Sequence, residues 1–325
     1  MTTKLSGSAA MKLVLMSIAI LQLSQLVLSF SSTQPSLSEA RQEATRLNII
    51  SATSSYFDQL SSNQQPQQQQ PQEADDAHSA HNVREELLDD VYDTLGQLYG
   101  SGAGIERMRR LNAARAKSTY LQVNPDQDKR HMTYGEIPLE LFTATLTRCS
   151  ELMADKPGHG SFIDLGSGVG RLVFAASMLS SAIESANGIW TESVGVEIVP
   201  DLHTAAMDAL YKAESIGFGN NNPNYLPVKF FVGDAFDPSS SVLSEASTIY
   251  AYSTTWECEG EEKTMVGLSQ SLSQCLRHGT IVAVTDRTLS SQHNFQFLES
   301  IEGMNVEKGG STATSTVNIY RFMKQ

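Results

Sequence analysis

The chain has 325 residues, enough for one large domain with extensions or for two small domains. Its formal net charge of −13 argues against a wholly basic nucleic-acid-binding protein, although it leaves room for a local basic patch. Cys149, Cys258 and Cys275 are widely spaced and form no Cys-x-x-Cys pair, so we expect packed thiols and no metal site.

The N-terminus has the composition of a targeting segment. In residues 1–29, two lysines precede an apolar run, a layout typical of a secretory signal peptide. Polar residues interrupt the run, so we expect no stable membrane span in the mature chain. The Ser- and Thr-rich residues 31–62 extend this pattern to a bipartite plastid-type presequence; the alternative is an N-terminal anchor. Residues 30–81, with a glutamine-rich centre, are predicted to be a disordered low-complexity linker.

A helical, partly basic segment is predicted over residues 82–131. Asn82 and Glu85 form a capping-box pattern, and apolar residues follow at helical spacing until Gly100. Residues 104–131 contain seven Lys and Arg residues against three acids, a net charge of +4. A solvated helix face followed by a loop accounts for this charge. The alternative is a contact to phosphate or to an acidic partner.

Strand and helix patterns alternate from residue 132 to residue 325, which predicts one α/β domain with a mostly parallel sheet. Strands are expected over residues 162–165, 194–198, 228–232, 248–252 and 281–285, with a closing pair over 297–303 and 315–322. Helices are expected over residues 138–154, 169–182, 202–215 (capped by Asp201) and 261–276.

A glycine turn follows the first strand. Glycines occupy positions 166, 168 and 170, directly after the acid Asp164, and a helix pattern begins at the end of the turn. Such a turn lets a nucleotide-like ligand lie against bare backbone at a helix N-terminus. The third glycine of a dinucleotide-binding fingerprint would fall at 171, which is Arg. Asp164 would repel a pyrophosphate but suits a ligand with an ammonium group and ribose hydroxyls, such as S-adenosylmethionine (SAM).

Three acids follow three successive strands: Asp164, Glu197 and Asp234. In parallel sheets a ligand binds beyond the carboxyl ends of the strands. We expect Asp164 to bind the methionine ammonium, Glu197 to accept both ribose hydroxyls, and Asp234 to accept the adenine amine. Together with the Gly166, Gly168 and Gly170 turn, these acids predict a SAM site.

The motif Thr133-Tyr134-Gly135-Glu136 lies about thirty residues before the glycine turn. With the strand-end motifs above, the region from about residue 132 to 286 resembles the non-SET histone lysine methyltransferases, the disruptor-of-telomeric-silencing family. The resemblance implies a Rossmann-like class I methyltransferase with helices on both faces of a seven-stranded sheet, in strand order 3-2-1-4-5-7-6. It also implies that Tyr134 and Glu136 cover the methionine part of SAM.

The chain departs from the pattern of this family at several positions. Arg171 stands where the family has Gln, and Ile137 where it has Thr. The fourth strand ends in residues 252–256, with Ser253 at the position of the family's methyl-side Asn. We interpret Tyr252 and Ser253 as the catalytic residues, which form an acceptor mouth with Trp256. The acid-rich residues 257–262 either attract a cationic substrate or favour the N-terminus of the following helix.

Three functions fit these patterns. The favoured one is a protein lysine methyltransferase with a histone or other protein substrate, contacting a nucleosome through residues 107–130; the resemblance implies a nuclear location. The acidic residues 132–325, with 11 Lys and Arg against 22 Asp and Glu, and the N-terminal signal favour instead a small-molecule or non-histone methyltransferase in a plastid or the secretory pathway. The third is a non-catalytic SAM-binding interaction protein.

Overall fold

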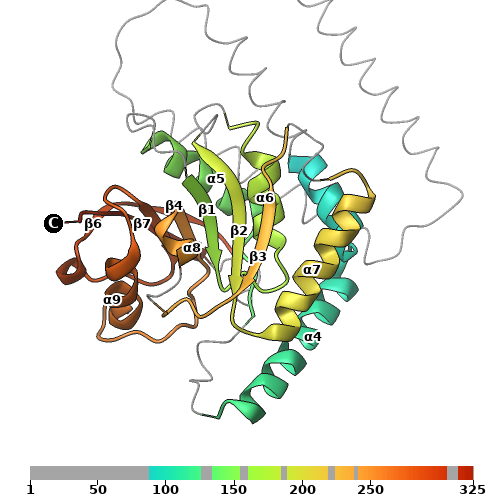
Figure 1. The fold of residues 1–325 in the computed structure, drawn as a ribbon, viewed down its shortest axis with the longest axis horizontal. Helices are drawn as coiled ribbons and strands as arrows, with labels where there is room; N and C mark the ends of the chain where they lie inside the picture. Colours follow the sequence, from blue (N-terminus) through green and yellow to red (C-terminus); the bar gives the residue numbers. More distant parts are fainter. Residues whose placement is uncertain are drawn as a thin grey trace, which may run out of the picture. The chain divides into compact units, whose positions relative to one another are not determined.

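The computed structural model describes residues 88–125, 134–153, 160–183, 189–218, 224–237, 241–305 and 314–324. The signal-like segment, the low-complexity linker and the capping box at Asn82 lie outside these ranges. The described residues form an α/β fold around one seven-stranded sheet, as predicted (Figure 1).

The sheet has the strand order β3-β2-β1-β4-β5-β7-β6, which confirms the order implied by the family resemblance. The neighbouring pairs from β3 to β5 are parallel, and β7 is antiparallel to both β5 and β6. The strands are β1 (Gly160–Leu165), β2 (Trp190–Glu197), β3 (Val228–Val232), β4 (Ala246–Ala251), β5 (Ile281–Thr285), β6 (Phe295–Met304) and β7 (Thr314–Phe322).

Helices cover both faces of the sheet because alternate side chains of each central strand are buried on opposite sides. On one face, Phe142 of α5 (Leu139–Glu151) contacts the rings of Phe162 and Tyr250. On the other, Ile163 and its neighbours pack with Leu268 of α9 (Val266–Cys275). Every residue of β1, β4 and β5 is buried, which explains why apolar residues stand next to each other in these strands instead of alternating with polar ones.

The N-terminal helical segment packs on the outer side of the glycine turn and α7. Residues 88–99 are helical and end at Gly100, as the apolar spacing predicted. Helix α4 (Ala103–Val123) follows, and its Ala113 and Ala116 belong to one apolar cluster with Leu202 of α7 (Pro200–Ser215). Figure 1 shows α4 and α7 side by side, and contacts between them confirm the arrangement.

Two predicted helix starts are wrong. The helix expected from residue 261 begins at Val266, because the backbone groups of Glu259 and Thr264 pair with each other and residues 260–263 form a turn. The acids of residues 257–262 therefore precede α9 rather than beginning it. Asp201 does not cap α7: the cap position is Val199, Pro200 begins the helix, and Asp201 lies in the first turn.

Helix α6 (Arg171–Leu179) is shorter at both ends than predicted. At its N-terminus the cause is Gly170, which takes the left-handed conformation at the N-cap. Among the described residues no helix is long and apolar enough to cross a membrane. The same part of the chain contains no cluster of His, Cys, Asp and Glu suited to a metal ion. The three cysteines are free thiols; Cys149 is buried, as expected of a packed thiol, and Cys258 and Cys275 are half-buried.

Candidate functional site

The glycine turn is held to the end of strand β2. The backbone N–H groups of Gly166 and Ser167 both donate to the carbonyl oxygen of Val196, at 2.8 and 3.1 Å. The turn therefore follows β1, and the strand order of the sheet reverses between β1 and β4. This is where an open α/β sheet binds a ligand.

Glu197 is fixed at the carboxyl end of β2. Its side chain is buried, and its two oxygens accept the backbone N–H groups of Gly168 at 2.7 Å and Val199 at 2.9 Å. Burial raises the pKa of Glu197, and the hydrogen bonds from the backbone oppose that rise. The carboxylate is thus rigidly oriented beside the glycine turn before any ligand binds.

Asp164, at the end of β1, is only 3% exposed. Burial, followed by the nearby charge of Glu197, raises the pKa of Asp164 well above its ordinary value. Within the described part of the chain, no side chain or backbone donor bonds to this carboxyl group, and the buried hydroxyl of Ser167 has no hydrogen-bond partner either. Buried polar groups are normally paired, so the Asp164 carboxyl group indicates a polar ligand that supplies donors, whereas the Ser167 hydroxyl packs against Gly195 of β2.

Asp234 follows β3 and is half-buried. Its Oδ1 atom accepts the backbone N–H of Phe236 at 2.9 Å, which orients the carboxylate at the strand end. Burial raises the pKa of Tyr120, on α4, and the charges of Asp234 and Glu197 raise it further. The structure therefore brings the three predicted acids to one edge of the sheet and adds α4 as a neighbour of two of them.

Aromatic rings cover the glycines of the site. The ring of Tyr134 lies so close to Gly168 that a β-carbon there would be 2.7 Å from Cε2 of the ring. Gly135 is covered in the same way by the ring of Tyr252, and Gly166 lies under Trp256. The loop of residues 134–136 thus lies between the glycine turn and the end of strand β4.

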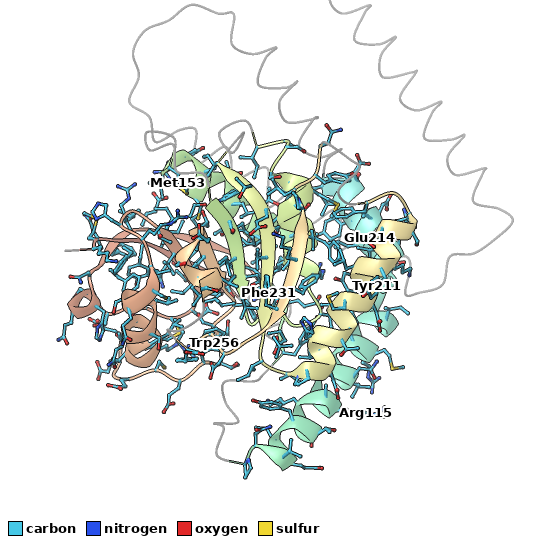
Figure 2. The ribbon with its side chains drawn as sticks, in the orientation of Figure 1. Arg115, Met153, Tyr211, Glu214, Phe231 and Trp256 are labelled. Carbon is cyan, nitrogen blue, oxygen red and sulfur yellow. The ribbon has the colours of Figure 1, made fainter. Side chains whose placement is uncertain are left out.

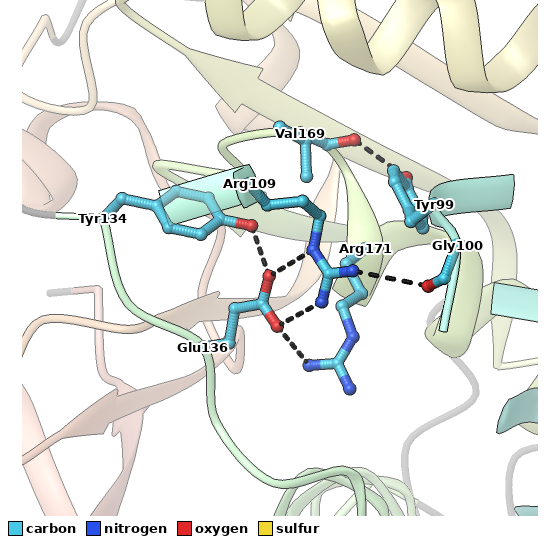
Figure 3. Close-up of polar contacts among 7 residues, drawn as sticks. All are labelled: Tyr99, Gly100, Arg109, Tyr134, Glu136, Val169 and Arg171. Carbon is cyan, nitrogen blue, oxygen red and sulfur yellow. Dashed lines mark hydrogen bonds and ion pairs between the residues drawn. The ribbon is translucent and has the colours of Figure 1, made fainter. Parts of the chain in front are cut away.

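Glu136 is the centre of a buried polar cluster (Figure 3). Arg109 of α4 donates to both of its oxygens, each at 3.3 Å, and Arg171 donates to Oε2 at 3.0 Å. The hydroxyl of Tyr134 donates to Oε1 at 2.5 Å. Burial alone would raise the pKa of Glu136, but Arg171, Tyr134 and Arg109 together hold it below its ordinary value. Glu136 is therefore an anion that joins α4, the loop of residues 134–136 and helix α6.

A second contact ties the N-terminal helices to the turn. The hydroxyl of Tyr99 donates to the carbonyl oxygen of Val169 at 2.8 Å, and Arg109 donates to the carbonyl oxygen of Gly100 at 3.5 Å (Figure 3). The sequence pattern was accounted for by a solvated basic helix face. Arg109 does not belong to such a face, because it is half-buried and bonded to Glu136 and Gly100. Arg107 and Arg115 are exposed, and Arg115 is marked on α4 in Figure 2; Lys129 and Arg130 lie outside the described residues.

The residues after strand β4 were expected to line an open mouth for the methyl acceptor, and one of them, Ser253, does not. Ser253 has no exposed surface, and its hydroxyl donates to the carbonyl oxygen of Thr285 at 2.9 Å. Tyr252 is half-buried, and its hydroxyl accepts a hydrogen bond from the amide of Asn305 at 3.2 Å. Trp256 is fixed by its backbone N–H, which donates to the carbonyl oxygen of Ser253 at 2.9 Å. Ser253 therefore shapes the turn instead of lining its surface.

The family model described as "Histone methylation protein DOT1" matches residues 122–295, just over half of the chain. The chain belongs to this family. The matched region spans the loop of residues 134–136, the glycine turn, the three strand-end acids and the end of β4. No curated protein matches the sequence.

Several solved structures resemble this DOT1 family member. The rRNA methyltransferase aviRa from Streptomyces viridochromogenes is 16% identical over 59% of this chain and 87% of that chain, with a TM-score of 0.41. A putative RNA methyltransferase from Pyrococcus horikoshii is 13% identical over 65% and 99% of the two chains, with a TM-score of 0.39. A putative sarcosine dimethylglycine methyltransferase from Galdieria sulphuraria is 12% identical over 65% and 99%, with a TM-score of 0.38. None of them indicates the methyl acceptor of this protein.

The DOT1 family assignment makes SAM the cofactor and methyl transfer the reaction. The described residues fit that cofactor. Asp164 offers a buried carboxylate for its ammonium group, and Glu197 and Asp234 offer oriented acceptor oxygens. Gly168 can hold this conformation only as glycine, because its φ of 55° and the ring of Tyr134 above it exclude a side chain.

Sequence reasoning missed three residues of this DOT1 site. Arg109 was indistinguishable from the other basic residues of its segment, and its partner Glu136 lies 27 positions away. Arg171 stood out only as a departure from the family pattern. Asn305 carried no signal, because its contact with Tyr252 joins the end of β6 to the end of β4, 53 positions apart.

Proposed function

We propose that this protein is a protein lysine N-methyltransferase with a histone-type substrate. The packing of Tyr252 on Gly135 carries the proposal, because it puts an aromatic wall at the end of β4 directly against the loop of residues 134–136. Membership of the histone methylation family DOT1 supports the acceptor class.

Each proposed cofactor residue would contact a different part of SAM. Bound SAM would supply a methyl group, carried on a positively charged sulfur, to an acceptor amine. Asp164 would hold its ammonium end, Glu197 its ribose hydroxyls, and Asp234 its adenine amine. Tyr134 covers the glycine turn and excludes water, while Glu136 holds Tyr134 in place through the hydrogen bond described above.

The acceptor side is formed by Tyr252 and Trp256. A lysine must lose its proton before it attacks, and a partly dry aromatic wall favours the neutral amine. Ser253 contributes by fixing the turn between these two rings. The exposed acids Glu257, Glu259 and Glu261 nearby offer a negative surface to a basic substrate segment.

Removing the hydroxyl of Tyr252 tests the acceptor side. We expect Tyr252→Phe to lower turnover by about tenfold, which corresponds to one hydrogen bond of roughly 1.4 kcal/mol, with cofactor affinity changed less than about twofold. Turnover is measured with tritiated SAM and histone octamers. Tyr211→Phe is the matched control, because Tyr211 is 63% exposed on α7 and should have no effect. Unchanged turnover in Tyr252→Phe would show that the hydroxyl of Tyr252 and its hydrogen bond with Asn305 play no part in methyl transfer.

The acceptor class is tested by incubating the full chain with tritiated SAM and nucleosomes, free histones or a cell extract, followed by mass spectrometry of the labelled fraction. The proposal predicts methyl-lysine in a protein. Label in small molecules only would contradict it. Measured SAM binding without label in any fraction would favour a non-catalytic SAM-binding interaction protein.

A second candidate is a small-molecule or non-histone methyltransferase in a plastid or the secretory pathway. The acidic charge of residues 132–325 and the replacement of the family's Asn by Ser253 favour it. Under the first proposal, this protein lies in the nucleus and contacts a nucleosome through the exposed Arg107 and Arg115. A fluorescent fusion of residues 1–62 distinguishes the two: organelle targeting favours the second, and failure to target favours the first.

A further inference from the structure

Asp286 is a further acid at the carboxyl end of a strand. It directly follows β5, which pairs with β4, and its backbone takes the left-handed conformation with a φ of 59°. Aspartate is among the residues that tolerate this conformation, and strained positions of this kind cluster at active sites. Its carboxylate bonds to Thr254, in the turn after β4, so this acid lies on the acceptor side of the site.

The carboxylate of Asp286 links β7 to the turn after β4. Its Oδ2 atom accepts the hydroxyl of Thr254 at 2.8 Å and that of Ser315 at 3.2 Å, and Oδ1 accepts the backbone N–H of Thr316 at 2.9 Å. Strands β5 and β7 already pair from Ile281 to Thr285, so these side-chain contacts are not needed to hold the two strands together. What they add is a connection from the hairpin to the proposed acceptor wall.

The carboxylate fixes the direction of the hydrogen bonds that lead to Tyr252. An ionised carboxylate only accepts, so the single hydroxyl hydrogen of Ser315 points to Asp286. The oxygen of Ser315 then accepts from the amide nitrogen of Asn305 at 2.8 Å, which sets the orientation of that amide. The same nitrogen donates its second hydrogen to the hydroxyl oxygen of Tyr252 at 3.2 Å. Asp286 therefore determines that Tyr252 accepts from Asn305 instead of donating to it.

The two residues between Asp286 and Tyr252 are shielded from water. Asn305 and Ser315 have no exposed surface. In such surroundings a hydrogen bond is stronger than at the surface, and no solvent molecule replaces a partner that is lost. A change at Asp286 should therefore pass along the chain of hydrogen bonds to the hydroxyl of Tyr252.

The backbone of Asp286 also connects to the second ring of the acceptor wall. Its carbonyl oxygen accepts the Nη1 atom of Arg287 at 2.9 Å, and the Nε atom of the same guanidinium group donates to the carbonyl oxygen of Trp256 at 3.1 Å. Residue 286 is thus linked to Tyr252 through its side chain and to Trp256 through its carbonyl group.

We propose that Asp286 is a positioning residue for methyl transfer, which holds the Tyr252 hydroxyl in the orientation that the methyl acceptor requires. Ser315 and Asn305 transmit this orientation. The proposal rests on the proposed function, because it takes Tyr252 as part of the acceptor mouth. Tyr252 packs on Gly135, whereas the strand-end acids assigned to SAM lie on other strands. We therefore expect Asp286 to affect turnover and not cofactor affinity.

Replacing Asp286 by asparagine keeps the shape of the side chain but adds a donor, so the direction of the hydrogen bonds is no longer fixed. With tritiated SAM and histone octamers, turnover of Asp286→Asn should fall about tenfold, as for Tyr252→Phe. Calorimetry with S-adenosylhomocysteine should show an affinity changed less than about twofold. In a Tyr252→Phe background, Asp286→Asn should lower turnover less than about twofold further, because the hydroxyl that it positions is already absent.

Glu192→Gln is the matched control, because it also turns a half-buried carboxylate into an amide. Glu192 lies on β2, accepts the hydroxyl of Ser161 at 2.9 Å and pairs with Lys229. Its replacement should leave turnover unchanged, and thermal unfolding checks that every variant folds.

Ser315→Ala removes the middle of the chain of hydrogen bonds and leaves Asp286 in place. It should lower turnover by a similar factor, and again only while the Tyr252 hydroxyl is present. This variant decides the question if Asp286→Asn does not fold.

Nuclear magnetic resonance of isotope-labelled tyrosine rings gives a readout that needs no methyl acceptor. Asp286→Asn should shift the signal of the Tyr252 ring carbon that bears the hydroxyl, and Glu192→Gln should not; Tyr252→Phe identifies the signal by its loss. An unshifted signal, unchanged turnover, or equal losses of turnover with and without the Tyr252 hydroxyl would each overturn the proposal. A shifted signal in a protein that methylates no histone contradicts only the proposed function.

Discussion

Replacing Glu136 by alanine is expected to lower the free energy of unfolding by about 3 kcal/mol at neutral pH, because two nearly buried arginines then lose their common anion. The effect should weaken in acid. The pKa of Glu136 in the folded protein lies below its ordinary value of about 4.3, so its stabilising contribution is fully present above that pH. It is lost as the pH falls through the lower folded-state value. Urea unfolding at several pH values measures both quantities.

Glu151→Ala is the matched control for this substitution. Glu151 pairs with Arg148 at 2.8 Å, but both side chains are 40% exposed or more, so its loss should cost less than about 1 kcal/mol. If Glu136→Ala and Glu151→Ala destabilise the protein equally, Glu136 is not the centre of a buried cluster.

Replacing Gly168 by alanine is expected to weaken cofactor binding by roughly 30- to 100-fold, or about 2–3 kcal/mol. The new β-carbon would meet the ring of Tyr134 at 2.7 Å, and the φ of 55° is unfavourable for alanine. Tyr134 would have to move, which breaks its hydrogen bond to Glu136, and the shifted backbone would disturb the bond from Gly168 to Glu197. Calorimetry with S-adenosylhomocysteine measures the loss.

Gly217→Ala separates backbone strain from the contact with the ring. Gly217 follows α7 with a φ of 85°, and a β-carbon added there would meet no atom within 4 Å. Its replacement should cost stability of about 1 kcal/mol and leave cofactor affinity unchanged. A Gly168→Ala variant that binds the cofactor like the wild type would mean that Tyr134 does not cover the turn.

The sheet and the strand-end acids could be predicted because they follow from local patterns. The fully buried strand β5 lies where its apolar run predicted, and so does the edge strand β3, although most of its residues are exposed. Parallel strands bring their carboxyl ends to one edge, so Asp164, Glu197 and Asp234 could be grouped without coordinates. The glycine turn could be predicted for the same reason, because its glycines directly follow the first strand in the sequence.

The tertiary contacts of the site could not be predicted in this way. Arg109 meets Glu136 only because α4 packs beside α7, and a run of basic residues cannot show which of them turns inward. Ser253 follows Tyr252 directly, yet it is fully buried with its hydroxyl on Thr285, a contact 32 positions away. The start of α9 was misplaced because the pairing of residues 259 and 264 competes with the helix.

Calorimetric titration of SAM into the full chain and into Asp164→Asn tests the central claim most directly. Asp164 is the buried acid for which the described chain offers no partner, so it should supply the charge that holds the cofactor. We predict one site per wild-type chain and an affinity at least about 30-fold weaker in Asp164→Asn, the loss of a buried charged contact of roughly 2 kcal/mol or more. No binding to the wild type, or equal binding to both proteins, would contradict the SAM site described above.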